Sequence, residues 1–138
     1  MKKIALWKNL IICLVVVAVL VVLMGPQSSV SMEALDQELV MKGTSGYTLR
    51  TTYAEIRQAE LRESLEYGAV VNGESGKREK SGTWKNEEFG EYRLCVDAKV
   101  NSCIVLYMES EIHVINIESN ESTASLYEAI LKLVDNTE

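Results

Sequence analysis

The sequence predicts a mainly β domain that ends in one α-helix and follows a membrane-spanning segment. Three observations predict this architecture. Residues 10–24 contain no polar side chain. Residues 91–117 contain alternating or continuous apolar runs between turn residues, a pattern typical of β-strands. Residues 119–134 carry an apolar stripe at helical spacing. A chain of 138 residues with such an apolar segment has room for one modest core.

The N-terminal segment, residues 1–26, is interpreted as a transmembrane anchor. A helix over residues 4–24 is about 32 Å long, enough to cross a hydrocarbon core of about 30 Å. Lys8 lies near its end, where a lysine can extend its ammonium to the interface. A cleaved signal peptide is the alternative, because Ser29-Val30-Ser31 offers small residues for cleavage. Cleavage would release a secreted form of the same domain.

The orientation of the segment follows from its basic residues. Lys2, Lys3 and Lys8 precede the apolar run, and the next basic residue is Lys42. By the positive-inside rule the N-terminus stays in the cytoplasm. The sequence therefore predicts a single-pass protein of the cell membrane whose C-terminal domain lies outside.

The charge of the domain disfavours several partners. Three of the 14 basic residues precede residue 33, and all 20 acidic residues lie at or after it, so the domain carries a net charge of −9. An acidic domain repels phosphate backbones, so we expect no binding to nucleic acid. For the same reason we do not expect the free domain to bind anionic lipid.

The first half of the domain has a mixed pattern. We place a linker at residues 27–31 and the domain at residues 32–138. Residues 32–41 fit a helix or a strand, and their residue types favour a helix. Residues 47–52 are aromatic and β-branched and favour a strand, and residues 53–56 are expected to turn the chain.

The middle of the chain is less regular. Residues 57–65 are compatible with a helix by composition and with a charged edge strand by the spacing of their apolar positions. Residues 68–82 are rich in glycine and charge and predict an exposed, mobile loop. Four cations here have glutamates around them in the sequence: Lys77, Arg78, Lys80 and Lys85. We interpret them as solvated side chains and not as an anion site.

The residue pattern in the second half of the domain predicts several strands followed by a helix. A short strand at residues 82–84 precedes three longer ones, which follow one another through short turns at residues 91–97, 103–108 and 112–117. Consecutive strands joined in this way predict an antiparallel meander.

The final helix is predicted over residues 119–134, with Ser122 or Thr123 as its N-cap. Its apolar stripe consists of Leu126, Ile130, Leu133 and Val134. A stripe of this kind must be buried, and here the sheet is the surface available to cover it.

Several of these motifs together resemble the bacterial pleckstrin-homology-like domains, which are often attached to membrane segments. The motifs are Gly82-Thr83-Trp84, Gly90-Glu91-Tyr92-Arg93-Leu94, Cys103-Ile104-Val105-Leu106, Ile115-Asn116-Ile117 and the helix with Thr123, Leu126 and Tyr127. The resemblance implies a strongly bent antiparallel sheet or barrel of roughly seven strands, closed by the C-terminal helix. It implies neither a common ligand nor a common catalytic residue.

No motif predicts catalysis, a metal or a cofactor. His113 is the only histidine. It alternates with Ile112 and Val114, so we expect it to point away from their face, toward solvent or a loop. A general base or a metal ligand needs partners that a lone histidine lacks. A small envelope hydrolase that uses His113 and dispersed acids is kept as an alternative.

Cys95 and Cys103 are candidates for a disulfide. They lack the spacing of a zinc or redox motif, but they fall on consecutive strands of the predicted meander. An oxidising location outside the membrane would allow a bond if both side chains share a face. The alternative is two buried, unpaired thiols.

Together these observations predict a tethered, extracytoplasmic binding or assembly module that is not an enzyme. Its contacts would be the membrane, through the N-terminal helix, and an unidentified membrane or envelope protein. The binding residues are not predicted by any motif.

The topology can be tested by proteolysis. Protease added to intact spheroplasts is expected to digest the domain, because the basic N-terminus holds the preceding residues inside. The measurement is an immunoblot against the C-terminus. Full protection before lysis, with digestion afterwards, would contradict the predicted orientation.

Overall fold

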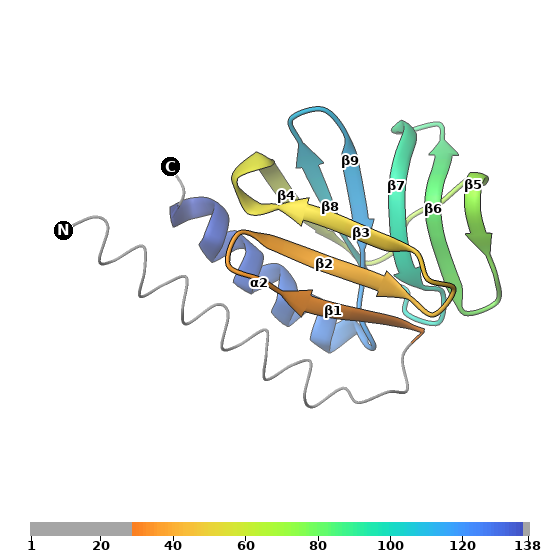
Figure 1. Ribbon diagram of the computed structural model, residues 1–138, viewed down its shortest axis with the longest axis horizontal. Helices are drawn as coiled ribbons and strands as arrows, with labels where there is room; N and C mark the ends of the chain where they lie inside the picture. Colours follow the sequence, from red (N-terminus) through yellow and green to blue (C-terminus); the bar gives the residue numbers. More distant parts are fainter. Residues whose placement is uncertain (1–28, 137–138) are drawn as a thin grey trace.

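Two β-sheets and one helix make up residues 29–136, the part of the chain that this computed structural model describes (Figure 1). The smaller sheet has the order β1-β2-β3 and the larger has the order β4-β8-β9-β7-β6-β5. The mainly β fold with one C-terminal helix is therefore confirmed. No helix of the described part is long and apolar enough to cross a membrane. The predicted anchor, residues 1–26, lies outside the described residues.

The elements have the following bounds. The smaller sheet contains β1 (Val30–Ala34), β2 (Glu38–Gly43) and β3 (Thr48–Thr52). A 3₁₀ turn, η2 (Tyr53–Glu55), leads into the larger sheet. That sheet contains β4 (Ile56–Arg62), β5 (Ala69–Ser75), β6 (Glu79–Asn86), β7 (Gly90–Asp97), β8 (Cys103–Met108) and β9 (Ile112–Ile115). The helix is α2 (Asn120–Asn136).

The segment at residues 32–41 is a hairpin, so the preference for a helix was wrong. Val30 and Met32 are buried while the residues between and after them are exposed, which is the period of a strand. Leu35, whose spacing from Leu39 suggested a helix, lies in the turn and is 36% exposed. Strand β1 also begins inside the segment that was assigned to a linker, at residues 27–31.

The segment at residues 68–82 is a second hairpin and not a mobile loop. Strands β5 and β6 pair antiparallel, and Gly76 N–H donates to the Glu79 carbonyl across the turn at 2.9 Å. Gly73 and Gly82 face each other across the pair, both with positive φ. A Cβ on either glycine would collide with the backbone of the opposite strand. Sequence reasoning missed β5 because every one of its residues is exposed.

The predicted meander is also wrong, although its strands were placed correctly. Strand β9 inserts between β8 and β7, pairing antiparallel with β8 and parallel with β7. The sheet is therefore not purely antiparallel. Periodicity along a strand indicates which face is buried, but it does not indicate which strands pair.

Two other expectations are confirmed: residues 53–55 turn the chain, and α2 buries its apolar stripe. Of the two alternatives for residues 57–65, the structure has the edge strand, β4, which ends at Arg62. The N-cap differs from the prediction: Ser119 Oγ accepts from the Ser122 amide at 3.0 Å, so Ser119 caps the helix. Thr123 Oγ1 instead accepts from the Ile117 amide at 3.1 Å and joins the helix to the chain after β9.

The core has two layers, one on each face of the larger sheet. The first lies between that sheet, the smaller sheet and α2, and its largest members include Met41, Leu106 and Leu126. The second lies on the opposite face around Trp84 and Tyr92. Each strand of the sheet centre therefore contributes side chains to both layers, as a strand buried on both faces must.

Asn116 holds the crossing between β7 and β8 in place. Its amide donates to the carbonyls of Asp97, Val100 and Ser102, each at 3.1 Å. Its Oδ1 accepts from the Asp97 amide at 2.7 Å. These four bonds satisfy one amide and three carbonyls of residues 97–102, the segment that joins β7 to β8.

We expect Asn116→Ala to lower the free energy of unfolding by about 2 to 3 kcal/mol, because several buried backbone groups lose their partners. Urea denaturation followed by circular dichroism measures the change. Asn101→Ala, at an exposed position of the same crossing, is the control and is expected to have little effect. Equal stabilities of the two variants would contradict this role.

Candidate functional site

The open edge of the larger sheet is the most distinctive exposed feature of the described residues. Strand β5 ends the sheet order, and Figure 1 shows no element beyond it. All seven of its residues are exposed, including Val70 at 40% and Val71 at 53%. The register shifts between Val70 and Asn72, so Val71 sits in a bulge. One side of β5 therefore offers unpaired backbone groups beside two exposed valines.

A hollow of about 830 Å³ lies beside the N-terminal end of β5. It is lined by Glu66, Gly68, Ala69, Lys85, Asn86, Glu87 and Glu88. Three of these seven residues are glutamates and one is a lysine, so the hollow favours a cationic group. Arg62 binds the Glu88 carboxylate through two nitrogens and holds the pKa of Glu88 below its usual value.

The only histidine of the sequence is buried, not exposed to solvent. It does point away from the face of Ile112 and Val114, but the smaller sheet covers the side toward which it points. His113 Nδ1 lies 2.8 Å from Thr51 Oγ1, and Nε2 lies 3.1 Å from Glu111 Oε1. Thr51 is fully buried, so the hydroxyl that contacts the ring is out of reach of a substrate.

Cys95 and Cys103 are both buried and free in the structure, which corresponds to the alternative of two unpaired thiols. They belong to opposite core layers, and β9 separates their strands. Burial raises the pKa of Cys95 to about 12 and that of Cys103 to about 11. Thiols with such pKa values stay protonated at neutral pH and are poor nucleophiles.

The four cations at residues 77–85 do not form one cluster. Lys77 and Arg78 lie in the turn between β5 and β6. The Lys80 ammonium lies 5.0 Å from the centroid of the Trp84 ring. Lys85 lines the hollow at the opposite end of β6.

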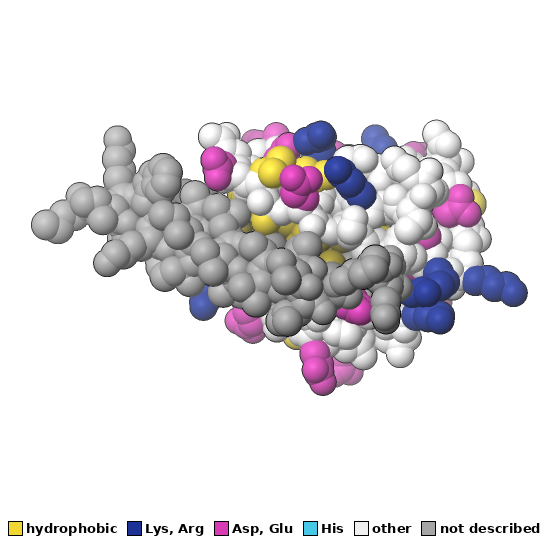
Figure 2. Space-filling model, turned by 60° about the horizontal axis from the view of Figure 1, so that its bottom comes forward, with side chains coloured by type: hydrophobic (Ala, Val, Ile, Leu, Met, Phe, Trp, Pro, Cys, Tyr) yellow, Lys and Arg dark blue, Asp and Glu magenta, His cyan; other side chains and the backbone are white. Residues whose placement is uncertain are grey.

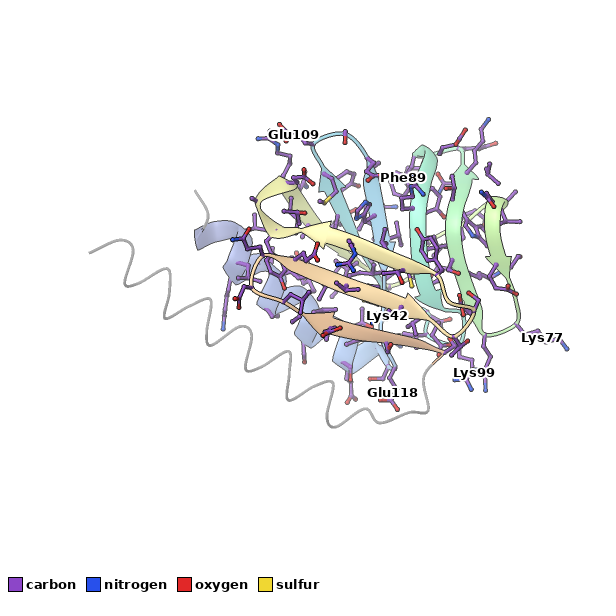
Figure 3. The ribbon with its side chains drawn as sticks, in the orientation of Figure 1. Lys42, Lys77, Phe89, Lys99, Glu109 and Glu118 are labelled. Carbon is purple, nitrogen blue, oxygen red and sulfur yellow. The ribbon has the colours of Figure 1, made fainter. Side chains whose placement is uncertain are left out.

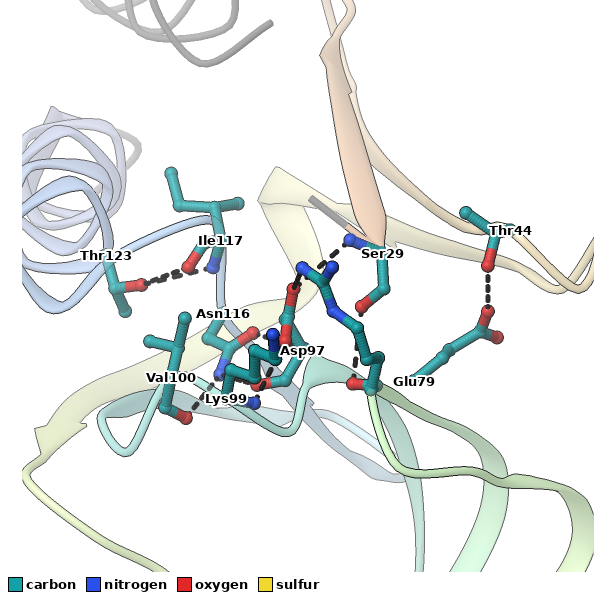
Figure 4. A network of polar contacts seen from close by, with 10 residues as sticks. Ser29, Thr44, Glu79, Asp97, Lys99, Val100, Asn116, Ile117 and Thr123 are labelled. Carbon is teal, nitrogen blue, oxygen red and sulfur yellow. Dashed lines mark hydrogen bonds and ion pairs between the residues drawn. The ribbon is translucent and has the colours of Figure 1, made fainter. Parts of the chain in front are cut away.

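Two carboxylates are buried where β6 begins and β7 ends (Figure 4). Glu79 accepts hydrogen bonds from Thr44, Ser45 and Ser81, at distances of 2.5 to 3.0 Å. Asp97 accepts from the amides of Ser29 and Lys99, at 3.1 and 2.9 Å. Arg78 also contacts Asp97, at 3.3 Å.

These two carboxylates serve the fold and not a ligand. Burial opposes their ionisation, but the donors around each one outweigh it and hold both pKa values below the usual range. Their acceptor sites are filled by donors of the chain itself. Among the described residues no group of three His, Cys, Asp or Glu is arranged to hold a metal ion.

Comparisons with known protein families, with curated proteins and with solved structures find no match for this chain. The resemblance to bacterial pleckstrin-homology-like domains therefore stays a prediction.

Stability should fall on acidification in two stages. Burial lowers the pKa of His113, and Glu111 opposes this only in part, so the unfolded chain takes up the proton first as the pH drops below about 6.5. The lowered pKa values of Glu79 and Asp97 add a second loss below about pH 4.5.

Thermal denaturation between pH 8 and pH 3 measures both stages. In His113→Asn the loss between pH 7 and pH 5 should disappear, while the loss below about pH 4.5 remains. Asparagine keeps a polar group near Thr51 without titrating in this range. If His113→Asn still loses stability between pH 7 and pH 5, His113 does not cause that loss.

Proposed function

We propose that this protein is a membrane-tethered binding or assembly module outside the cytoplasmic membrane, with a pleckstrin-homology-like domain that takes up an extended segment of another envelope protein. The open edge of β5 carries this proposal. An extended segment would add to it as a seventh strand of the larger sheet. Backbone hydrogen bonds would supply much of the affinity, as in other cases of strand addition.

The two edges of the larger sheet differ in a way that supports this assignment. Sheet edges that must stay unpaired commonly carry lysine, proline or charge pairs. Strand β4 fits that description, with Arg57 paired to Glu109 and Arg62 paired to Glu60. Strand β5 has a single charged residue, Glu74, and no lysine or proline. Its bulge limits uncontrolled pairing but leaves Val70 and Val71 exposed.

The chemistry of the bound segment follows from its surroundings. Val70 and Val71 favour apolar side chains on the added strand. The hollow with Glu66 and Glu87 favours a lysine or arginine near one end of the segment. A partner segment with alternating apolar residues and one flanking cation fits both features.

The buried chemical groups support a module without catalysis. His113 and Thr51 are buried between the two sheets. The cysteine thiols are buried and have raised pKa values. The alternative function is a hydrolase that uses His113. Such an enzyme would need a path by which substrate reaches the buried imidazole ring.

Photo-crosslinking in intact cells tests the proposal. A photo-reactive amino acid in place of Glu74 is expected to form an adduct with another envelope protein. Val70→Lys with Val71→Lys should reduce the adduct by at least about tenfold, because lysines oppose strand addition at an edge. Leu35→Lys with Leu61→Lys changes two exposed apolar residues elsewhere and is the matched control.

The control pair is expected to leave the adduct unchanged. Two results would contradict binding at β5. One is equal adduct formation in the two double variants, and the other is no adduct in the chain whose only change is the photo-reactive residue at position 74. Circular dichroism of all variants checks that the fold is kept, which we expect because the four positions are exposed.

A further inference from the structure

Three cations from two different turns gather at one end of the domain, around its first described residue. We call this the Ser29 end and define it by Ser29, Lys77, Arg78 and Lys99. Figure 3 places Lys77 and Lys99 at the end where β1 begins, and Glu109 at the opposite end. In Figure 2 the largest group of Lys and Arg side chains on the visible face likewise lies at one end of the molecule.

Hydrogen bonds fix this arrangement. Ser29 Oγ donates to the Arg78 carbonyl at 3.3 Å, and the Ser29 amide donates to Asp97 Oδ2 at 3.1 Å. The Lys99 amide donates to the other oxygen of the same carboxylate. The side chains of Lys77, Arg78 and Lys99 are exposed. Within residues 29–136, neither lysine forms an ion pair with an acid.

The opposite end of the domain carries five glutamates in its turns and strand ends: Glu66, Glu87, Glu88, Glu109 and Glu111. The last three of them form ion pairs with arginines of the domain. At the Ser29 end, Glu79 and Asp97 are buried and bonded to donors of the chain, and Glu118 is a partly exposed acid nearby. The domain is therefore acidic overall, and Lys77, Arg78 and Lys99 are its exposed cations at the Ser29 end.

The length of chain before Ser29 sets how far this end can lie from a membrane. Only residues 25–28 separate the apolar run from Ser29. Four residues span at most about 14 Å when fully extended. With the tether of the proposed function, the Ser29 end lies close to the headgroups, where a lysine or arginine feels the surface potential of an anionic leaflet.

We propose that the Ser29 end binds the headgroups of anionic phospholipids in the membrane that holds the tether, and so orients the domain upright. This inference rests on the tether of the proposed function. Each cation near such a surface contributes roughly a fivefold preference, so the two lysines, Lys77 and Lys99, contribute on the order of 25-fold. That is too little to recruit a free domain of charge −9, but the tether makes the contact intramolecular.

The orientation matters for the edge strand. Strand β5 runs from Ala69, which pairs with Lys85, toward Ser75, which pairs with Lys80 near the Ser29 end. In an upright domain the C-terminal end of β5 therefore lies near the bilayer, and its N-terminal end lies far from it. Its N-terminal end and the neighbouring hollow are then presented to partners instead of to lipid.

Energy transfer in vesicles tests the orientation with the full chain. A fluorescent amino acid replaces Ser110 at the acidic end, and the acceptor is a headgroup-labelled lipid. In vesicles that contain phosphatidylglycerol we expect low transfer, because an upright domain holds Ser110 far from the surface. Lys77→Glu with Lys99→Glu should raise transfer to the level measured in phosphatidylcholine vesicles. Arg57→Glu with Lys85→Glu, which changes charge away from the Ser29 end, should leave transfer low.

Salt provides a second test, because screening in about 1 M salt should also raise the transfer. Transfer that is the same in both kinds of vesicle and in all variants would overturn the orientation while leaving the tether intact. Release of the chain from the vesicles by salt alone, measured by flotation, would overturn the tether and this inference together.

Discussion

The arrangement of the two sheets depends on a pair of buried carboxylates. Glu79 and Asp97 face each other across β6 and β7. Two like charges at such positions repel each other, and burying a carboxylate is costly unless donors surround it. The smaller sheet supplies many of those donors, through Ser45 in its β2–β3 turn and through Ser29 before β1. Without the smaller sheet, both carboxylates would lose partners, so the two sheets are energetically linked at this end.

The same contacts connect the fold to the proposed activity. Because Asp97 binds the Ser29 amide, the chain that precedes the domain must leave it beside Arg78 and Lys99. This contact therefore fixes where the preceding chain is attached and which cations surround that point. It also fixes the direction of β5 relative to the point of attachment. A tethered domain with this geometry can face lipid with one end and offer a free strand edge to a partner.

The sequence predicted local features better than the contacts between distant segments. The strand at residues 103–108 and the buried stripe of α2 follow from periodicity alone. The parallel pairing of β7 with β9 does not, because it depends on Asn116 and a chain crossing that leave no periodic signal. Strand β5 was missed because its exposed residues show no alternation, although two valines between glycines were a usable signal. The alternation around His113 correctly predicted the face of the strand to which it points. Nothing in that strand indicated that a second sheet covers this face.

A double-mutant cycle between Glu79 and Ser45 tests the central claim, that this buried carboxylate holds the smaller sheet. The free energy of unfolding is measured for Glu79→Gln, for Ser45→Ala and for the pair of substitutions. Because Ser45 Oγ lies 2.5 Å from the carboxylate, the account predicts a coupling energy of at least about 1 kcal/mol. A coupling energy near zero would show that the Ser45 hydroxyl does not stabilise the Glu79 carboxylate and would contradict the central claim.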